Sequence, residues 1–254
     1  MRLSIAVLAS TLGLLASTLL PISSHADTFS ASYLAAGVQT PNGNTNYNTF
    51  DSGSFNSANK TTTFNGSSIT GTYSGSYNVV SANQYGGAGG SGNFITTTGS
   101  YSLSLSSSAN YFGLWFSALD NGNQLSFYKD NSLVYSFTPA NYKAIVGGCP
   151  SSSNAFCGNP TQSFLGKDSG EQFAFLNFYD SNGTFNKVTF TQTLAGAAFE
   201  SDNHTVALTD QAPLGTNIVT PEPSSWILAM TGIFCIGGVV AVRRMKTVSR
   251  FHAS

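Results

Sequence analysis

Apolar and polar residues alternate with a period of two along much of the middle and end of the chain. Such runs, rich in Phe, Tyr, Val, Thr and Leu, are typical of β-strands with one buried face. Between residues 27 and 219 no long stretch shows the helical period of 3.6 residues, and Gly, Ser, Thr and Asn interrupt the chain throughout. The pattern predicts strands at 61–72, 101–105, 111–117, 124–129, 133–138, 173–179, 187–192 and 205–209.

Short turns between these runs predict an all-β fold. Asp130 and Asn131 separate two alternating runs, and both residue types tolerate the positive φ of a tight hairpin turn. Many short strands with such turns favour an antiparallel β-sandwich of jelly-roll type over residues 27–219. Residues 40–100, rich in Asn, Gly, Ser and Thr, are expected to form either polar strands or a mobile arm, with a long loop at 86–92.

One apolar run allows its two faces to be compared. Phe112, Leu114 and Phe116 share the face that we assign to the core. Trp115 lies on the other face, where it either points outward as a candidate ligand-stacking side chain or fills a second layer. Tyr111 on that face, and Tyr128 in a later run, are further candidates for stacking against a sugar ring.

The N-terminal segment has the pattern of a secretory signal peptide. Met1 and Arg2 precede an apolar run at 3–20, and the small residues Ser24 and Ala26 stand at the −3 and −1 positions of a cleavage site. We therefore expect a signal peptide at 1–26, cleaved after Ala26. The alternative is an uncleaved anchor helix.

A second apolar run, at 226–242, stands near the C-terminus. Its 17 residues reach the lower end of the length that spans a bilayer as a helix. The basic cluster of Arg243, Arg244 and Lys246 that follows is expected to stay cytoplasmic by the positive-inside rule. The run therefore predicts one transmembrane helix that holds an exported domain.

Pro221, Glu222 and Pro223 precede that helix. The order of Pro-Glu-Pro, short apolar helix and Arg-rich end resembles the PEP-CTERM sorting signal of Gram-negative bacteria, over residues 220 to about 250. The resemblance implies passage through the inner membrane, then cleavage near Pro221–Pro223 by an exosortase, a membrane-embedded cysteine transpeptidase, and release to the cell surface or an exopolysaccharide matrix. The alternative is a permanent single-pass anchor.

Three further stretches, 111–128, 173–179 and 199–205, resemble the ectodomains of other exosortase-dependent surface proteins. This resemblance implies a single domain that ends near Asp210. It implies no catalytic residue, because no activity is attached to those ectodomains.

Charge is scarce and unevenly distributed. Charged residues make up 8% of the chain and aromatic residues 13%. Residues 27–219 hold five lysines, no arginine and ten acidic residues, a net charge of −5. Nucleic-acid binding needs a basic surface that displaces counterions from phosphates, so this class of partner is excluded.

Cys149 and Cys157 flank a segment made almost wholly of turn residues. Outside the cytoplasm we expect them to form a disulfide, the alternatives being free thiols or a metal site that would need further ligands.

The inventory of catalytic side chains is small. Strand alternation would place Glu200, Asp202 and His204 on one face, where they could hold a metal or transfer protons, or simply form a solvated strand end. Glu200 and Asp202 could also serve as the carboxyl pair of a glycosidase. The segments 120–123 and 180–183 place oxygen ligands beside glycine, as calcium loops do, but Asx turns have the same composition.

These observations favour an exported, non-catalytic cell-surface or matrix protein that associates with exopolysaccharide and carries no cofactor. The alternatives are a secreted carbohydrate-active enzyme and a calcium-dependent carbohydrate-binding module.

Overall fold

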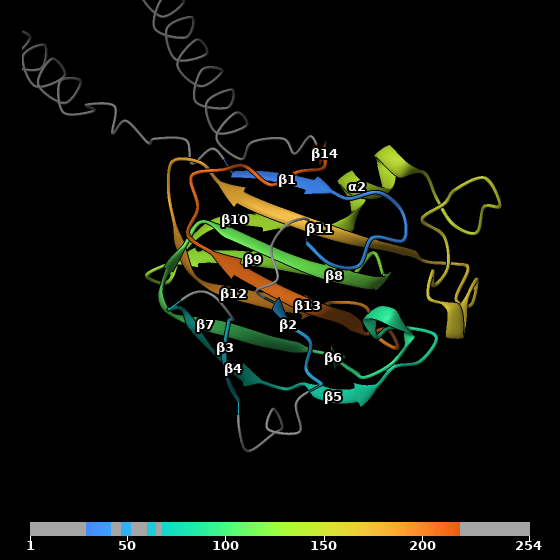
Figure 1. The fold of residues 1–254 in the computed structure, drawn as a ribbon, viewed down its shortest axis with the longest axis horizontal. Helices are drawn as coiled ribbons and strands as arrows, with labels where there is room; N and C mark the ends of the chain where they lie inside the picture. The colour runs from blue at the N-terminus through green and yellow to red at the C-terminus, as the bar shows by residue number, and fades with distance from the viewer. Residues whose placement is uncertain (1–28, 42–46, 52–59, 65–67, 219–254) are drawn as a thin grey trace, which may run out of the picture.

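Two antiparallel β-sheets form the framework of the protein in a computed structural model, which describes residues 29–41, 47–51, 60–64 and 68–218. Sheet A, at the front of Figure 1, has the strand order β14-β1-β11-β8-β13-β6-β5, and β2 also pairs with β13. Its strands are β1 (Phe29–Tyr33), β2 (Tyr47–Asn48), β5 (Asn78–Ser81), β6 (Asn93–Thr97), β8 (Tyr111–Leu119), β11 (Gln172–Asp180), β13 (Phe199–Ala207) and β14 (Thr216–Ile218).

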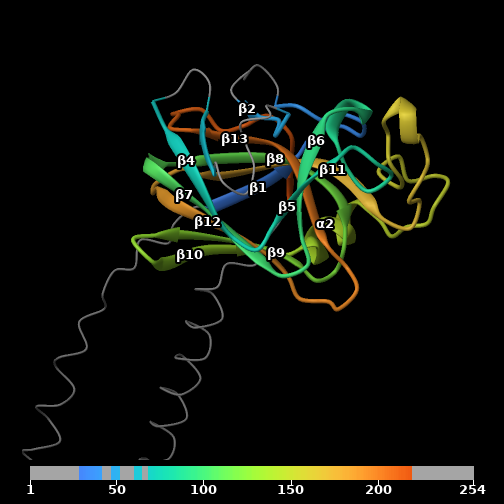
Figure 2. The same cartoon turned by 90° about the horizontal axis from the view of Figure 1, so that it is seen from below.

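Sheet B lies behind sheet A, with the order β10-β9-β12-β7-β4-β3. Its strands are β3 (Thr61–Thr63), β4 (Thr70–Gly75), β7 (Ser100–Ala109), β9 (Asn123–Lys129), β10 (Ser132–Phe137) and β12 (Phe185–Gln192). The connections hold the helix α2 (Pro139–Val146) and the 3₁₀ turns η1 (Ala88–Gly90) and η2 (Gln162–Phe164). Figure 2 shows the sheets as two stacked layers, so the all-β, sandwich-like prediction is confirmed for the described residues.

The main core fills the space between the sheets. Phe112, Leu114 and Phe116 of β8 belong to it, as predicted. They meet aromatic rings of sheet B, such as Phe190, whose ring centroid lies 5.9 Å from that of Phe112. The alternation of β8 therefore assigns this face to the core correctly.

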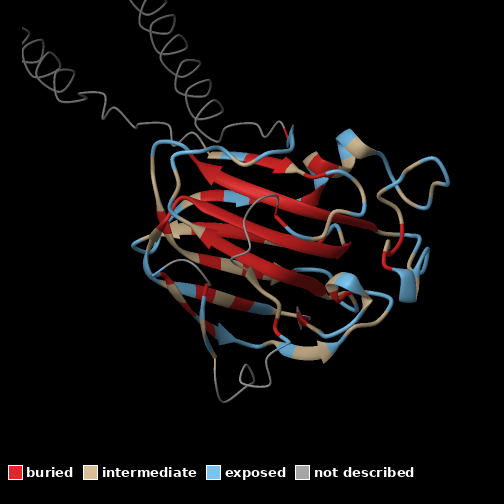
Figure 3. Cartoon of the chain, in the orientation of Figure 1, coloured by how far each residue is buried: buried red, intermediate tan, exposed pale blue. Residues whose placement is uncertain are grey.

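The two sheets differ in what covers their outer faces. In sheet B, Tyr101 and Leu103 of β7 point into the core, whereas Ser102 points outward and its hydroxyl lies 3.0 Å from that of Thr189 on β12. In sheet A, every residue of β8 and β11 is buried, so these strands appear red along their whole length in Figure 3. The centre of sheet A is therefore covered on both faces.

The predicted hairpin is confirmed. Strands β9 and β10 pair with Ser132 opposite Lys129, and the turn residues Asp130 and Asn131 have φ values of 48° and 69°. The run 61–72 contains two strands, β3 and β4, instead of one. The run predicted at 205–209 begins too late, because β13 starts at Phe199.

Cys149 and Cys157 form a disulfide, as expected, in the loop between α2 and β11. The polar region at 40–100 forms strands β2 to β6 where it is described, and the glycine-rich segment at 86–92 connects β5 to β6 through η1.

Replacing Asn131 by valine is expected to lower the free energy of unfolding by about 1–2 kcal/mol, because a β-branched residue at positive φ is strained. Asn131→Gly is the matched control, since glycine adopts this conformation without a steric cost. Urea denaturation of the two variants beside the wild type measures the difference. Equal destabilisation by valine and glycine would show that the turn conformation is not what matters.

Candidate ligand-binding site

The outer face of sheet A carries a second, smaller hydrophobic layer. Trp115 is 1% exposed and packs there with Leu34, Ala118 and Phe173. Its ring therefore fills a layer, which is one of the two placements that the sequence left open. An indole buried in this way has no free face for a ligand to stack against.

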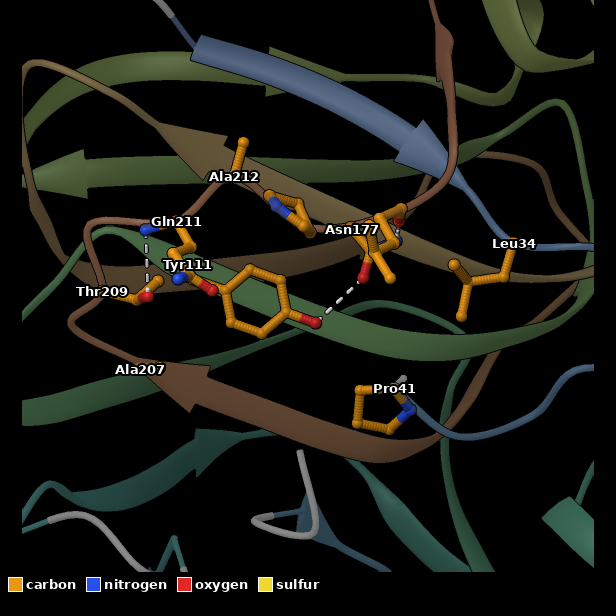
Figure 4. Close-up of a pocket in the computed structure, with 10 residues that line it drawn as sticks. Leu34, Pro41, Tyr111, Asn177, Ala207, Thr209, Gln211 and Ala212 are labelled. Atoms are coloured by element: carbon orange, nitrogen blue, oxygen red, sulfur yellow. Dashed lines mark hydrogen bonds between the residues drawn. The ribbon is translucent and has the colours of Figure 1, made fainter. Parts of the chain in front are cut away.

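Beside this layer lies a cavity of about 460 Å³, which we call the Tyr111 pocket (Figure 4). Tyr111 of β8, Asn177 of β11 and Ala207 of β13 form its floor. The segments 34–41 and 209–214 form its walls, with Leu34 and Pro41 contributed by the first of them. The pocket is thus built from three strands and two loops that lie far apart in the sequence.

Tyr111 lies along its own strand. The phenol hydroxyl donates to Oδ1 of Asn177 at 2.9 Å, and it passes over Gly113, two residues further along β8. A Cβ at position 113 would collide with that hydroxyl and would lie 3.0 Å from Cε1 of Phe175. Glycine at this position therefore allows the Tyr111 ring to lie over the strand and line the pocket.

Hydrogen bonds fix the walls to the floor. Nδ2 of Asn177 donates to the carbonyl oxygen of Leu214 at 3.2 Å. Asn110 binds Thr209 twice, through Nδ2 to its carbonyl oxygen at 2.8 Å and through Oδ1 from its N–H at 2.9 Å. The backbone N–H of Gln211 donates to Oγ1 of Thr209, and Figure 4 draws this bond as a dashed line between the two labelled residues. The pocket is therefore largely formed without a ligand.

The lining of the Tyr111 pocket is uncharged. Apolar groups come from Leu34, Pro41 and Pro213, and polar groups from the phenol, amide and hydroxyl side chains already described. Burial raises the pKa of Tyr111 well above its ordinary value, so the phenol stays neutral and keeps its proton. Such a surface suits a neutral ligand that offers both an apolar face and hydroxyl groups.

The three residues predicted to share a face of β13 do not do so. Asn203 has a φ of 52°, and the pairing of β13 with β8 shifts register between Asp202 and Thr205. A bulge of this kind turns the following side chains to the opposite face. Asp202 lines a cavity on the outer face, whereas His204 lies in the main core between the sheets. The predicted proton-transfer group with His204 is therefore wrong.

His204 belongs to a buried polar chain. Its Nδ1 lies 2.9 Å from the Tyr73 hydroxyl and its Nε2 lies 2.9 Å from Oγ of Ser201, which in turn lies 3.2 Å from the Tyr101 hydroxyl. Burial lowers the pKa of His204 to about 3, so the imidazole is neutral. The contact between Ser201 and His204 resembles a nucleophile with its base, but the imidazole is fully buried, and its partners satisfy it as a core residue.

Acidic side chains gather at the end of the sheets near β8 and β11. Burial and the neighbouring Asp168 and Asp120, through their charge and through side-chain hydrogen bonds with Glu171, raise the pKa of Glu171 to about 8. Burial and the same acids raise the pKa of Glu200 to about 8. Glu200 thus interacts with this group, whereas burial raises the pKa of Asp202 well above its usual range in the separate outer cavity.

The two segments considered for calcium contain Asx-type hydrogen bonds. Oδ1 of Asp180 accepts from the N–H of Gly183 at 2.8 Å, and Oδ1 of Asn123 accepts from the N–H of Asp120 at 2.7 Å. Within the described ranges, no group of three or more His, Cys, Asp and Glu side chains is placed to hold a metal ion. Tyr128 lies on the outer face of sheet B, where Nζ of Lys187 stands 4.7 Å from its ring centroid.

The predicted sorting elements lie outside the described residues. They are Ala26, Pro221, Glu222, Pro223, Arg243, Arg244, Lys246 and the helix at 226–242. Among residues 29–41, 47–51, 60–64 and 68–218, no helix is long and apolar enough to cross a membrane.

No protein-family model matches the chain, and no curated protein matches its sequence.

The shifted pKa values of Glu171, Glu200 and His204 predict that folding is most stable near pH 4.5. Neutral His204 contributes stability that is complete above about pH 6.5 and is lost as the pH falls toward 3, because the unfolded imidazole takes up a proton. Glu171 and Glu200 contribute stability that is complete below about pH 4.5 and is lost as the pH rises toward 8, because the unfolded carboxyls ionise first.

Urea denaturation at about pH 3, 4.5 and 8.5 measures this profile. Glu171→Gln and Glu200→Gln are expected to weaken the loss on the alkaline side and leave the acid side unchanged. A wild-type protein that is more stable at pH 8.5 than at pH 4.5 would contradict the prediction.

Proposed function

We propose that the protein is an exported, non-catalytic component of the cell surface or extracellular matrix of a Gram-negative bacterium. The C-terminal helix first anchors the protein in the inner membrane. An exosortase then cleaves the chain near Pro221–Pro223 and releases the domain. The order of signal peptide, Pro-Glu-Pro motif, apolar run and basic cluster in the sequence supports this proposal. The Cys149–Cys157 disulfide is consistent with an oxidising compartment.

The Tyr111 pocket is the observation that carries the proposal of a binding role for the exported domain. It combines an aromatic ring, amide and hydroxyl groups and apolar walls, and no charged side chain lines it. An uncharged sugar unit of a matrix polysaccharide has this chemistry, with apolar ring faces and many hydroxyls. We therefore propose that the pocket binds a neutral segment of exopolysaccharide and that it does so without a cofactor. The domain that carries the pocket is proposed to be a sandwich of jelly-roll type.

Intact-mass measurement of the protein from membrane, surface and medium fractions of the native cells tests its processing. We expect a released chain that begins at Asp27 and ends near Pro221–Pro223, because the signal peptide and the sorting helix are both removed. A chain that still carries residues 226–254 and occurs only in the inner membrane would overturn the sorting proposal.

Replacing Ala212 by tryptophan is expected to abolish binding to the polysaccharide of the native cells, because an indole would fill the pocket that Ala212 lines. Ala140→Trp is the matched control, since Ala140 is exposed on α2 and does not line the pocket. The full chain in detergent is tested by co-sedimentation with the purified polysaccharide. Equal binding by the two variants, or no binding by the wild type, would overturn the assignment of the pocket.

A further inference from the structure

A second cavity, of about 300 Å³, lies on the outer face of sheet A. We call it the Asp202 cavity. Gln39 and Thr40 line it, and the next residue, Pro41, lines the Tyr111 pocket, so the segment 39–41 forms a wall of both cavities. Unlike the Tyr111 pocket, the Asp202 cavity carries two carboxyl groups, from Asp51 and Asp202.

Asp202 is held in place by backbone groups. Its side chain is 2% exposed, its Oδ2 accepts from the N–H of Ala88 at 2.8 Å, and its Oδ1 accepts from the N–H of Asn203 at 2.7 Å. A carboxylate has about four acceptor positions, so these two bonds leave capacity for further donors. The negative charge of Asp51 contributes to raising the pKa of the Asp202 carboxyl group. Among the described residues, no Lys or Arg side chain contributes an opposing shift.

Asp51, the second carboxyl group of the cavity, is also held by backbone groups. Its Oδ1 accepts from the N–H of Asn93 at 2.6 Å, and the carboxylate lies against Gly92, where a Cβ would collide with Oδ1. The backbone N–H of Asp51 donates to Oγ1 of Thr49. Two acidic groups from distant parts of the chain are thus held at one cavity by their hydrogen bonds and by a close approach to glycine.

The rest of the cavity is polar and aromatic. The N–H of Gly89 donates to the side-chain oxygen of Gln39, and Nδ2 of Asn203 donates to the carbonyl oxygen of Gln39 at 2.7 Å. Tyr47, on β2, adds an aromatic ring to the lining. Asn203 is the bulge residue with positive φ, a conformation that often accompanies functional sites.

We propose that the Asp202 cavity binds the ammonium group of an amino sugar, with Asp51 and Asp202 as its counter-charges. An ammonium group has three donors and no acceptor, which complements two carboxylates that retain acceptor capacity. The hydroxyls of the sugar meet Gln39, Thr49 and Asn203, and the ring of Tyr47 offers a surface to the ligand. A bound cation stabilises the ionised form of Asp202, which burial alone disfavours.

This site is separate from the neutral-sugar site proposed above, although both cavities lie on the same face. A polymer that contains free amino sugars among neutral units would have ligands for both. The two proposals can fail independently, because they rest on different residues and on different charges of the ligand.

Isothermal titration calorimetry of the full chain in detergent tests the Asp202 cavity with glucosamine, its β-1,4-linked trimer and the uncharged N-acetylglucosamine. We expect glucosamine and the trimer to bind at least about tenfold more tightly than N-acetylglucosamine, because acetylation removes the charge. Asp51→Asn and Asp202→Asn are expected to reduce glucosamine binding by a similar factor. Asp210→Asn is the matched control, since Asp210 is exposed and does not line the cavity.

Asp51 is exposed, so Asp51→Asn tests the site even if Asp202→Asn fails to fold. Equal affinity for glucosamine and N-acetylglucosamine, or unchanged glucosamine binding in Asp51→Asn, would overturn the proposal. The proposal would also be overturned if calcium ions bound more tightly than glucosamine and if this calcium binding were lost in both Asp51→Asn and Asp202→Asn. Glucosamine binding retained by Ala212→Trp would show that the site does not depend on the Tyr111 pocket.

Discussion

The burial of β8, β11 and β13 on both faces is the constraint on which the rest of the structure depends. One face of these strands meets sheet B, and the other would expose large side chains such as Trp115 and Phe173 to water if nothing covered it. The segments 34–41 and 209–214, together with η1, supply that cover. Both cavities lie on this loop-covered face, between the sheet and the segments that cover it.

The bulge at Asn203 divides β13 between two roles. Before it, Asp202 faces the outer layer and meets the N–H of Ala88. After it, His204 faces the core and joins a chain of buried hydroxyls from both sheets. One inserted residue therefore gives a single strand a carboxyl group at the outer cavity and a neutral imidazole in the interior. Burial raises the pKa of the carboxyl group and lowers the pKa of the imidazole.

The sequence predicts well what depends on neighbouring residues. The turn at Asp130 and Asn131 and the core face of β8 follow from local conformational preferences and from alternation, and both are found in the structure. The placement of His204 could not be predicted in this way, because a bulge leaves no distinct pattern in the sequence and reverses every later side chain. Strand β1 was not predicted, and residues 40–100 were left open between polar strands and a mobile arm, because Asn, Gly, Ser and Thr are also the residues of loops.

The candidate sites depend on contacts that no local pattern contains. The walls of the Tyr111 pocket come from two ends of the described chain, and Tyr111 itself was one of three candidate aromatic residues. Asn177 offered a local signal, as a lone amide within the apolar run at 173–179, but its role appears only when Leu214 is beside it. Trp115 was the more prominent aromatic residue in the sequence, and the cover over sheet A removes it from solvent.

The pairing of β1 with β14 brings the two ends of the described chain to one edge of sheet A. Strand β14 has three residues and, among the described strands, pairs only with β1, and its last residue, Ile218, lies opposite Ala31. A mechanical force applied through the chain beyond residue 218 therefore acts first on this short edge strand. Peeling β14 away breaks few hydrogen bonds and leaves the central strands paired, so the edge would yield under tension before the layers of the sandwich separate.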